Sequence, residues 1–370
     1  MRVYYHGIHE NNGGLENFAK NLIESVLKKD STIKYTFLAE KENFSYRKYF
    51  EELGCEVIIL PHSRKHPLKF YKKLRNVLYN VDRNDSIVQL NICSYRNYFL
   101  FKACKKAKLK TIIVGHYSKI KGKLGFLHYI NKLIFAKFGL KVTISEDVTN
   151  FMFKDKEHVF YIDNGISSDK FSFSNEYRSE IRKQLNVSDD CFVIGQVGRI
   201  SSEKNQEFSI QAFNALKDKT NLDAKLVFVG KQSETKVLDV ASKSKYKNDI
   251  LFLGSIDTDV YKYYSAFDCC LMPSRHEGMP LSLLECCANG VPTLLSNSVP
   301  KLNFECSKLK YLSLETDKWV SSLEDLSKNK YLKRKNYLAN TEYDIDVCSN
   351  KYINLYHNFD KVLNCINSGE

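Results

Sequence analysis

The 370-residue sequence contains little proline and glycine, with 6 and 16 residues, and only one tryptophan. This scarcity excludes long flexible linkers and collagen-like repeats. No apolar run reaches the roughly 20 residues that a membrane-spanning helix needs. The opening residues also lack the basic and then apolar pattern of a secretory signal. None of the 11 cysteines is spaced as C-x-x-C, so we expect buried free thiols rather than disulfides or zinc.

Positive charge is distributed unevenly along the chain. There are 56 Lys and Arg against 43 Asp and Glu, and the whole excess of +13 lies in residues 1–165. Apolar residues make up 43% and charged residues 27%, which is typical of a folded protein and excludes disorder. The length suggests about two domains. The basic first half therefore needs an explanation of its own.

Short apolar runs typical of strands alternate with longer amphipathic runs typical of helices. The first half predicts strands at 2–6, 33–38, 56–60, 86–90, 111–115, 141–144 and 159–162, and helices at 15–28, 44–53 and 68–79. The second half predicts strands at 191–197, 225–229, 249–253, 269–272 and 292–295, and helices at 206–216, 261–267, 280–289 and 346–363. This rhythm predicts an α/β protein with two Rossmann-like, doubly wound parallel-sheet domains that leave a cleft between them.

A turn sequence marks the boundary between the two predicted domains. The residues Asp163-Asn164-Gly165-Ile166 have turn chemistry and precede a polar stretch. We therefore expect an N-terminal domain at 1–164 and a second domain at 165–345. The tail at 346–370 is expected to be a helix that can pack back on the first domain.

The most specific motif follows the predicted strand at 269–272. Glu277 and Gly278 lie on a tight loop, a helix is expected to begin at Pro280, and Glu285 lies inside that helix. Unpaired N–H groups in the first turn of a helix form an anion site. Glu285 is flanked by apolar neighbours, and a carboxylate held there needs donors such as two sugar hydroxyls. An exposed glutamate on a surface helix is the alternative for Glu285.

The Glu-x7-Glu spacing of Glu277 and Glu285 in this context resembles the signature of the retaining nucleotide-sugar glycosyltransferase family 4, or glycosyltransferase group 1, which has the GT-B fold. The variant found here looks most like the bacterial exopolysaccharide and capsule branch. The resemblance implies that Glu277 contacts the donor sugar and that Glu285 holds the ribose hydroxyls. It also implies that the donor diphosphate lies against the loop formed by Gly278, Met279, Pro280 and Leu281.

Residues in three further segments agree with this resemblance. Arg199 and Lys204 resemble the family's Arg-x4-Lys pair, and two cations beside a departing diphosphate stabilise the charge that develops there. Two unrelated surface cations are the alternative. Gly13 and Gly14 precede the first predicted helix, where glycine lets backbone amides approach an anion. Ile256 matches the place where the family's backbone pairs with the nucleobase.

His116 and the acidic pair Asp257 and Asp259 are further candidates for functional residues. His116 follows the predicted strand at 111–115, and the resemblance implies a catalytic position near the donor sugar, although Tyr117 follows it where the family often has Asp. A structural histidine is the alternative; His6 and His9 are lesser candidates. The Asp257-Thr258-Asp259 sequence is better explained by helix N-capping than by a metal site. With cations available for the phosphates, we expect no essential metal and no other cofactor.

The basic stretch from Lys119 to Lys141 contains no acid and has apolar residues at helical spacing. This pattern is typical of a helix on an anionic membrane surface, with Lys121, Lys123 and Lys132 as the docking residues. A core-packed helix with a solvated basic face is the alternative. No zinc finger, RNA-recognition or helix-turn-helix pattern occurs, so we expect no nucleic acid partner.

These features predict a retaining, metal-independent glycosyltransferase. The resemblance implies transfer from a nucleotide sugar, expected to be a UDP-sugar, to a glycan or lipid-linked glycan during bacterial surface polysaccharide synthesis. We expect the protein to be cytoplasmic, or peripheral on the inner face of the plasma membrane. Two alternatives remain open: a nucleotide-sugar epimerase on the same fold, and a non-catalytic partner subunit of that fold.

Overall fold

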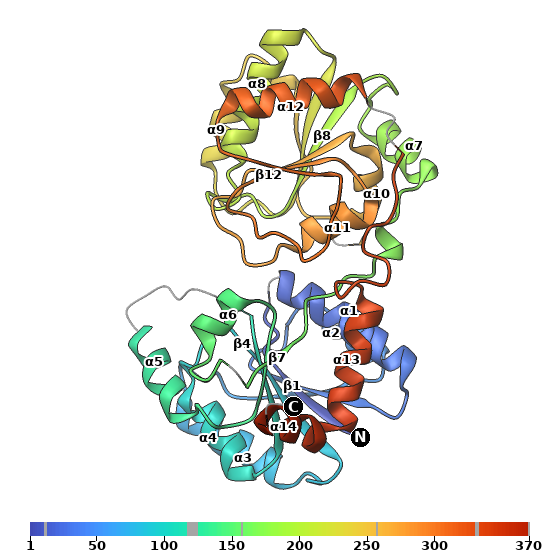
Figure 1. Ribbon diagram of the computed structural model, residues 1–370. Coiled ribbons are helices and arrows are strands. Elements are labelled where there is room, and N and C mark those ends of the chain that lie inside the picture. Colours follow the sequence, from blue (N-terminus) through green and yellow to red (C-terminus); the bar gives the residue numbers. More distant parts are fainter. Residues whose placement is uncertain (11–12, 117–124, 157, 257, 330–332, 369–370) are drawn as a thin grey trace. The chain divides into compact units, whose positions relative to one another are not determined.

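The computed structural model describes residues 1–10, 13–116, 125–156, 158–256, 258–329 and 333–368. They form two compact units, Met1–Ile166 with Asn340–Glu370, and Ser167–Ala339. Each unit is built around one parallel sheet with helices on both faces (Figure 1). The predicted doubly wound α/β class is therefore confirmed.

The chain passes between the units twice, and the two passages pair with each other. The Ile166 N–H donates to the Tyr343 carbonyl at 3.0 Å, and the Ile345 N–H donates to the Ile166 carbonyl at 2.8 Å. Gly165 is required here because a Cβ would lie 2.9 Å from the Ile345 Cα. This pairing places Asn340–Ile345 in the first unit, whereas the sequence analysis expects the second domain to continue to residue 345.

The first unit has a seven-stranded sheet in the order β3-β2-β1-β4-β5-β6-β7. Its strands are β1 (Arg2–His6), β2 (Lys34–Ala39), β3 (Glu56–Ile59), β4 (Ser86–Ile92), β5 (Lys110–Gly115), β6 (Leu140–Thr143) and β7 (Phe160–Tyr161). Its helices are α1 (Gly14–Lys29), α2 (Arg47–Glu52), α3 (Pro67–Tyr79), α4 (Tyr98–Ala107), α5 (Gly125–Ile134), α6 (Glu146–Met152), α13 (Ile345–His357) and α14 (Phe359–Ser368). Alternate residues of each strand face opposite layers, so Tyr5 packs beneath α1 while Tyr4 packs on the α3 and α4 side.

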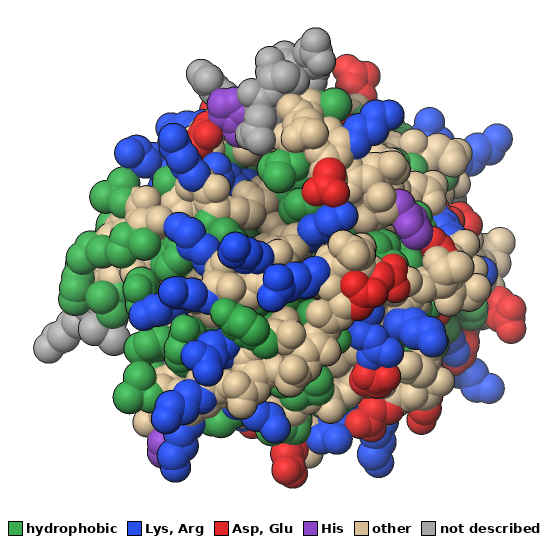
Figure 2. All heavy atoms as spheres, turned by 90° about the horizontal axis from the view of Figure 1, so that it is seen from below, with side chains coloured by type: hydrophobic (Ala, Val, Ile, Leu, Met, Phe, Trp, Pro, Cys, Tyr) green, Lys and Arg blue, Asp and Glu red, His purple; other side chains and the backbone are tan. Residues whose placement is uncertain are grey.

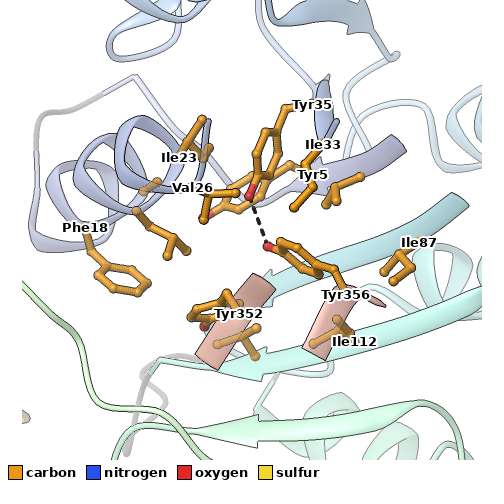
Figure 3. Packing of buried hydrophobic residues seen from close by; sticks show 14 of the residues in the cluster. Tyr5, Phe18, Ile23, Val26, Ile33, Tyr35, Ile87, Ile112, Tyr352 and Tyr356 are labelled. Carbon is orange, nitrogen blue, oxygen red and sulfur yellow. Dashed lines mark hydrogen bonds between the residues drawn. The ribbon is translucent and has the colours of Figure 1, made fainter. Parts of the chain in front are cut away.

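Helix α13, from the end of the chain, completes the core of the first unit. It lies against α1, and its Tyr352 and Tyr356 are buried with Phe18 and Tyr35 (Figure 3). The Tyr35 hydroxyl donates to the Tyr356 hydroxyl at 3.3 Å. The C-terminal segment is therefore an integral layer of the first unit.

The second unit has a six-stranded sheet in the order β10-β9-β8-β11-β12-β13. Its strands are β8 (Phe192–Val197), β9 (Ala224–Val229), β10 (Ile250–Phe252), β11 (Cys269–Met272), β12 (Thr293–Ser296) and β13 (Leu309–Leu312). Its helices are α7 (Asn175–Gln184), α8 (Gln206–Thr220), α9 (Lys236–Ser242), α10 (Val260–Ala266), α11 (Leu281–Asn289) and α12 (Thr316–Lys328), with 3-10 turns η1 (Asp169–Phe171) and η2 (Lys247–Asp249). Trp319 of α12 is fully buried and packs on Phe208 of α8, which closes one face of this sheet.

A buried ion cluster anchors α7 to the second sheet. Asp268 is fully buried and accepts hydrogen bonds from Arg178 at 2.7 Å and from Arg182 at 3.2 Å. It also accepts from the Val193 N–H at 2.8 Å. Because every bond satisfies a group that has lost its water, the cluster fixes the start of the second unit.

Several elements differ from the sequence-based prediction. Helices α4, α6, α7, α9 and α12 and strand β13 were not predicted. Helix α2 begins at Arg47 rather than at residue 44, because Tyr46 adopts a left-handed conformation with φ of 62°. Pro280 is the N-cap of α11 rather than a residue of its first turn.

Two global features complete the description. Eight of the eleven cysteines are buried, in agreement with the expectation of buried thiols. Among the residues that the structure describes, no helix combines the length and apolar character that crossing a bilayer requires.

Candidate active site

The Glu-x7-Glu and Arg-x4-Lys motifs meet at one edge of the second sheet. Strand β8 lies between β9 and β11, so the chain turns to opposite sides after β8 and after β10. Loops that leave neighbouring parallel strands at such a switch point bound a crevice where ligands bind. Here the two loops are 198–205, after β8, and 273–280, after β11.

Lys204 and Glu277 join these loops directly. The Lys204 Nζ lies 2.6 Å from the Glu277 Oε1 and donates a hydrogen bond to it. The two side chains are only 21% and 10% exposed, so water screens the pair less than it screens a surface pair. The structure thus brings together two residues that are 73 positions apart, and Lys204 is not a freely solvated cation.

Arg199 takes a different position from Lys204. Its side chain is 61% exposed, and its guanidinium lies 3.9 Å from the Glu203 carboxylate on the same loop. Its backbone carbonyl accepts a hydrogen bond from Gln206 at 3.1 Å. The loop backbone is therefore fixed while the guanidinium extends into solvent.

Asn205 and Arg275 hold the two loops together and were missed by the sequence analysis. The buried Asn205 donates to the Pro273 carbonyl at 3.0 Å and accepts from the Arg275 guanidinium at 3.0 Å. The Arg275 N–H donates to the Glu203 carbonyl at 2.8 Å. Asn205 has φ of 56°, a left-handed conformation that asparagine tolerates better than most residues. The asparagine just before a predicted helix was the signal available.

Glu285 lies on α11 with a buried tyrosine as partner. The Tyr264 hydroxyl, from α10, donates to the Glu285 carboxylate. Burial raises the pKa of Glu285 to about 7, although the Tyr264 hydrogen bond and the Lys204 charge act to lower it. Glu285 is half-buried, so the structure does not place it as a freely solvated surface glutamate. Lys204 is thus in electrostatic reach of Glu285 as well as bonded to Glu277.

Glycines shape the backbone on the β8 side of this edge. A Cβ on Gly230 would lie 2.1 Å from the Gly198 carbonyl oxygen, and both residues have positive φ, +149° and +143°. The strand ends therefore approach more closely than any other residue allows. By contrast, a Cβ on Gly278 would meet no atom within 4 Å, which leaves the α11 loop open to a ligand.

The remaining predicted donor-loop residues lie where their strands end. Met279 precedes the N-cap Pro280, and Leu281 opens α11. Ile256 is half-buried beyond β10. Asp259 is the N-cap residue of α10, but its side chain makes no capping hydrogen bond, and Asp257 lies outside the described residues.

His116 stands at the carboxyl edge of the first sheet, directly after β5. Its Nε2 lies 3.1 Å from the Asn91 Oδ1, and its ring centroid lies 6.3 Å from that of Phe18. Burial lowers the pKa of His116 to about 4, so the imidazole is neutral at physiological pH. Among the lesser candidates, His6 lies 3.8 Å from the Glu40 carboxylate, and the His9 N–H donates to Glu16 at 3.3 Å.

Gly13 and Gly14 form the start of α1 in the same unit. Gly13 is the N-cap residue with extended backbone, and Gly14 is the first helical residue. A Cβ on Gly14 would meet no atom within 4 Å, so this helix start is sterically open. Phe18, one turn further along α1, contacts the His116 ring.

Of the three expected membrane-docking lysines, the structure describes only Lys132. Lys121 and Lys123 lie outside the described residues. Lys132 is half-buried, and its amino group donates to the carbonyls of Phe151 at 2.7 Å and Asn150 at 3.2 Å. Lys132 therefore holds the end of α6, and its assignment as a lipid contact stays a prediction. Among the described residues, no three His, Cys, Asp or Glu side chains are gathered as metal ligands would be.

Comparison with known proteins agrees with this geometry. Residues 177–334 match the family "Glycosyl transferases group 1". The putative glycosyltransferase EpsF of Bacillus subtilis is 25% identical over 304 residues, which cover 78% of this chain and 77% of EpsF. The UDP-Gal:alpha-D-GlcNAc-diphosphoundecaprenol alpha-1,3-galactosyltransferase of Escherichia coli is 28% identical over 150 residues, 40% of this chain and 38% of that protein.

Solved structures share the fold over nearly the whole chain. Anabaena Alr3699/HepE in complex with UDP superposes with a TM-score of 0.77 at 14% identity, covering 96% of this chain and 100% of that one. WaaG, a glycosyltransferase involved in lipopolysaccharide biosynthesis, gives 0.67 at 16% identity, with 96% and 99% covered. The chain therefore has the GT-B fold, and its residues 177–334 carry a glycosyl transferases group 1 domain that is similar to glycosyltransferases of bacterial polysaccharide synthesis.

Proposed function

We propose that the protein is a retaining glycosyltransferase that moves a sugar from a UDP-sugar to a hydroxyl of a glycan or lipid-linked glycan. The observation that carries this proposal is the Lys204–Glu277 pair at the switch point of the second sheet, with Glu285 in electrostatic reach of Lys204. A site with one cation and two carboxylates suits a ligand that has both an anionic diphosphate, which the cation binds, and neutral hydroxyls, which donate to the carboxylates.

The proposed donor site divides these chemistries among named residues. Lys204 and the exposed Arg199 neutralise the diphosphate. Backbone at Gly278 and the start of α11 approaches the same phosphates, because a helix start favours an anion and nothing crowds Gly278. Glu277 accepts hydrogen bonds from the sugar and Glu285 from the ribose, with Ile256 beside the base.

The proposed reaction keeps the configuration at the anomeric carbon. The acceptor oxygen bonds to C1 on the face from which the UDP oxygen departs. The acceptor's proton passes to the leaving phosphate oxygen, so no enzymic nucleophile is needed. The protein contributes position and charge: Lys204 and Arg199 stabilise the leaving diphosphate, and no metal ion is required.

Names of similar proteins support the choice of donor and acceptor. The Escherichia coli relative is named for UDP-Gal and a diphosphoundecaprenol-linked acceptor, and the Anabaena protein was crystallised with UDP and with UDP-glucose. A further relative from Escherichia coli is named an O-antigen biosynthesis glycosyltransferase. We transfer only the class of donor and the class of acceptor to this chain.

The test is a screen of UDP-sugars, first for thermal stabilisation and then for transfer. The preferred donor raises the melting temperature, because a ligand that binds only the folded state stabilises it. With that donor and a panel of lipid-linked and free glycan acceptors, and with EDTA present, we expect the product to keep the α configuration of the donor, in which the anomeric proton is equatorial. Inversion of configuration contradicts the proposal. Conversion of donor without acceptor indicates an epimerase, and binding without conversion indicates a non-catalytic subunit.

We also propose an anionic lipid surface as the partner of the first unit. Helix α5 is oriented with its polar residues inward: His128 and Asn131 are buried and bond to the backbone of Tyr95. Its large apolar residues point outward and are about half-exposed or more, namely Phe126, Tyr129, Ile130, Leu133 and Ile134. A soluble helix normally has the opposite arrangement.

Basic side chains accompany this apolar face. Phe135, just after α5, packs on Phe101 of α4. Exposed cations line α3 and α4, namely Lys69, Lys72, Lys73, Arg75, Lys105 and Lys106. Figure 2, which views the molecule from below, shows apolar side chains gathered at the left margin and Lys and Arg side chains beside them. Apolar insertion flanked by cations is the combination that binds anionic bilayers.

Co-sedimentation with vesicles containing phosphatidylglycerol tests this surface. We expect Phe126→Ser with Leu133→Ser, and Lys72→Glu with Lys73→Glu, each to reduce binding at least about tenfold. Leu314→Ser, an exposed apolar position in the second unit, is the matched control. Lys121→Glu with Lys123→Glu tests the remaining lysines of the sequence-based prediction. Equal binding of all variants rejects the lipid partner.

A further inference from the structure

His116 is attached to a buried asparagine whose orientation can be deduced. Asn91, on β4, is 3% exposed. Its Nδ2 lies 3.1 Å from the backbone carbonyl oxygen of His6, and its Oδ1 lies 3.1 Å from the His116 Nε2. A backbone carbonyl can only accept a hydrogen bond, so the amide nitrogen of Asn91 must face His6. The amide oxygen must then face His116.

This orientation determines where the His116 ring carries its proton. An amide oxygen can only accept, so the Nε2 of His116 must be the donor in the contact with Asn91. In a neutral imidazole one nitrogen donates and the other accepts. Nδ1 is then the acceptor of the ring. Since burial keeps the ring neutral, this state holds at physiological pH.

A chain of buried side chains supports the same orientation of Asn91. Gln89, also on β4 and fully buried, donates from Nε2 to the Asn91 Oδ1 at 3.2 Å. The Gln89 Oε1 accepts from the Tyr356 hydroxyl at 2.5 Å, and Tyr356 accepts from Tyr35 at 3.3 Å. The Tyr35–Tyr356 bond is the dashed line of Figure 3. Each donor therefore faces an acceptor from Tyr35 to Asn91.

We propose that Asn91 is a positioning residue that holds His116 in the tautomer protonated on Nε2, so that Nδ1 is presented as the acceptor for a substrate hydroxyl. The proposal concerns His116 as a site residue and in that respect rests on the proposed function. Phe18 limits rotation of the imidazole from the α1 side, since its ring contacts that of His116. A hydrogen bond on one nitrogen and an aromatic wall together fix the ring plane.

Nuclear magnetic resonance of the full-length protein with ¹⁵N-labelled histidine tests the tautomer. His116→Gln identifies the His116 signals by their loss. At mildly alkaline pH we expect a protonated Nε2 and an unprotonated Nδ1 in the unchanged protein. A proton on Nδ1 overturns the proposal. This measurement needs no turnover, so its result is independent of whether the proposed donor and reaction are correct.

Two substitutions test whether Asn91 determines the tautomer of His116. Asn91→Leu removes the acceptor, so we expect a mixture of tautomers and kcat lower by about tenfold to a hundredfold with the donor KM little changed. Asn91→Asp keeps an acceptor, so Nε2 should remain protonated. Asn131→Leu is the matched control, because Asn131 is also buried in this unit but bonds to Tyr95. A His116 spectrum that is unchanged in Asn91→Leu, or altered equally in Asn131→Leu, overturns the proposal.

Discussion

Lys204 and Glu277 belong to loops from different strands, and their Nζ and Oε1 atoms are nevertheless 2.6 Å apart. Neither side chain is held only by this contact, because Asn205 and Arg275 fasten the same loops through backbone and side-chain bonds. The ion pair is therefore placed before any ligand arrives. Charge that is already oriented costs little to reorganise when a phosphate approaches.

The ion pair yields the first prediction. Lys204→Met and Glu277→Gln each lower the rate of sugar transfer at least about 100-fold, the scale for loss of one preorganised charged contact. Steady-state kinetics with the preferred donor measures the effect. Lys236→Met is the matched control, because Lys236 pairs with Glu207 on the exposed surface of the same unit. Near-normal rates in both folded site variants would contradict the assignment.

The second prediction concerns the pH dependence of donor binding. Burial raises the pKa of Glu285 to about 7, and ribose hydroxyls bind the carboxylate better than the neutral acid. Affinity should therefore rise as pH increases through this pKa, by about tenfold from about pH 6 to about pH 8. UDP-glucose is the right probe for calorimetry, because its phosphates do not titrate in this range as that of UDP does. Glu285→Gln should abolish the pH dependence of donor binding. If affinity still changes with pH in that variant, Glu285 is not the group responsible.

Two glycines give the third prediction, with opposite outcomes. Gly230→Ala places a Cβ 2.1 Å from the Gly198 carbonyl, so it should lower the melting temperature and weaken donor binding together. Gly278→Ala meets no protein atom within 4 Å, so the melting temperature should not change. If the diphosphate lies against this loop, Gly278→Ala should still weaken UDP-glucose binding. Unchanged affinity in Gly278→Ala means that the ligand does not approach there.

The buried ion cluster gives the fourth prediction. Asp268→Asn leaves Arg178 and Arg182 without a counter-charge and should reduce the free energy of unfolding by about 3–5 kcal/mol. Chemical denaturation monitored by circular dichroism provides the measurement. Asp218→Asn, which breaks an exposed pair with Lys245, should leave the unfolding midpoint unchanged. Equal stability of the two variants would show that α7 is held by apolar packing alone.

The sequence predicted the fold class well because its signals are local. Continuous apolar runs such as 191–197 are typical of strands buried on both faces, and the structure has β8 at Phe192–Val197. Short or polar helices and strands were not predicted. Helix α7 has one fully apolar buried side chain, Ile181, and depends on Arg182 reaching Asp268. Hydropathy has no means of showing that an arginine is a core residue.

The residues of the candidate site were likewise predicted only in part. Motif spacing pointed to Glu277, Glu285, Arg199 and Lys204, and the structure brings Lys204 to Glu277. The partners that hold them could not be predicted, because Tyr264 comes from another helix and contacts Glu285 only in the folded unit. Helix α5 shows the same limit. Its periodicity left both a membrane-facing helix and a core-packed helix open, and only the structure shows that His128 and Asn131 are on the buried side.

The placement of α13 in the first unit has a consequence for biosynthesis. Tyr352 and Tyr356 are core residues beneath β1, so this core stays open until both residues have left the ribosome, after the whole second unit has been made. The second unit has no such dependence and can fold while translation continues. The segment that is made before the second unit must therefore wait for α13, which is made after that unit, before its own core is complete.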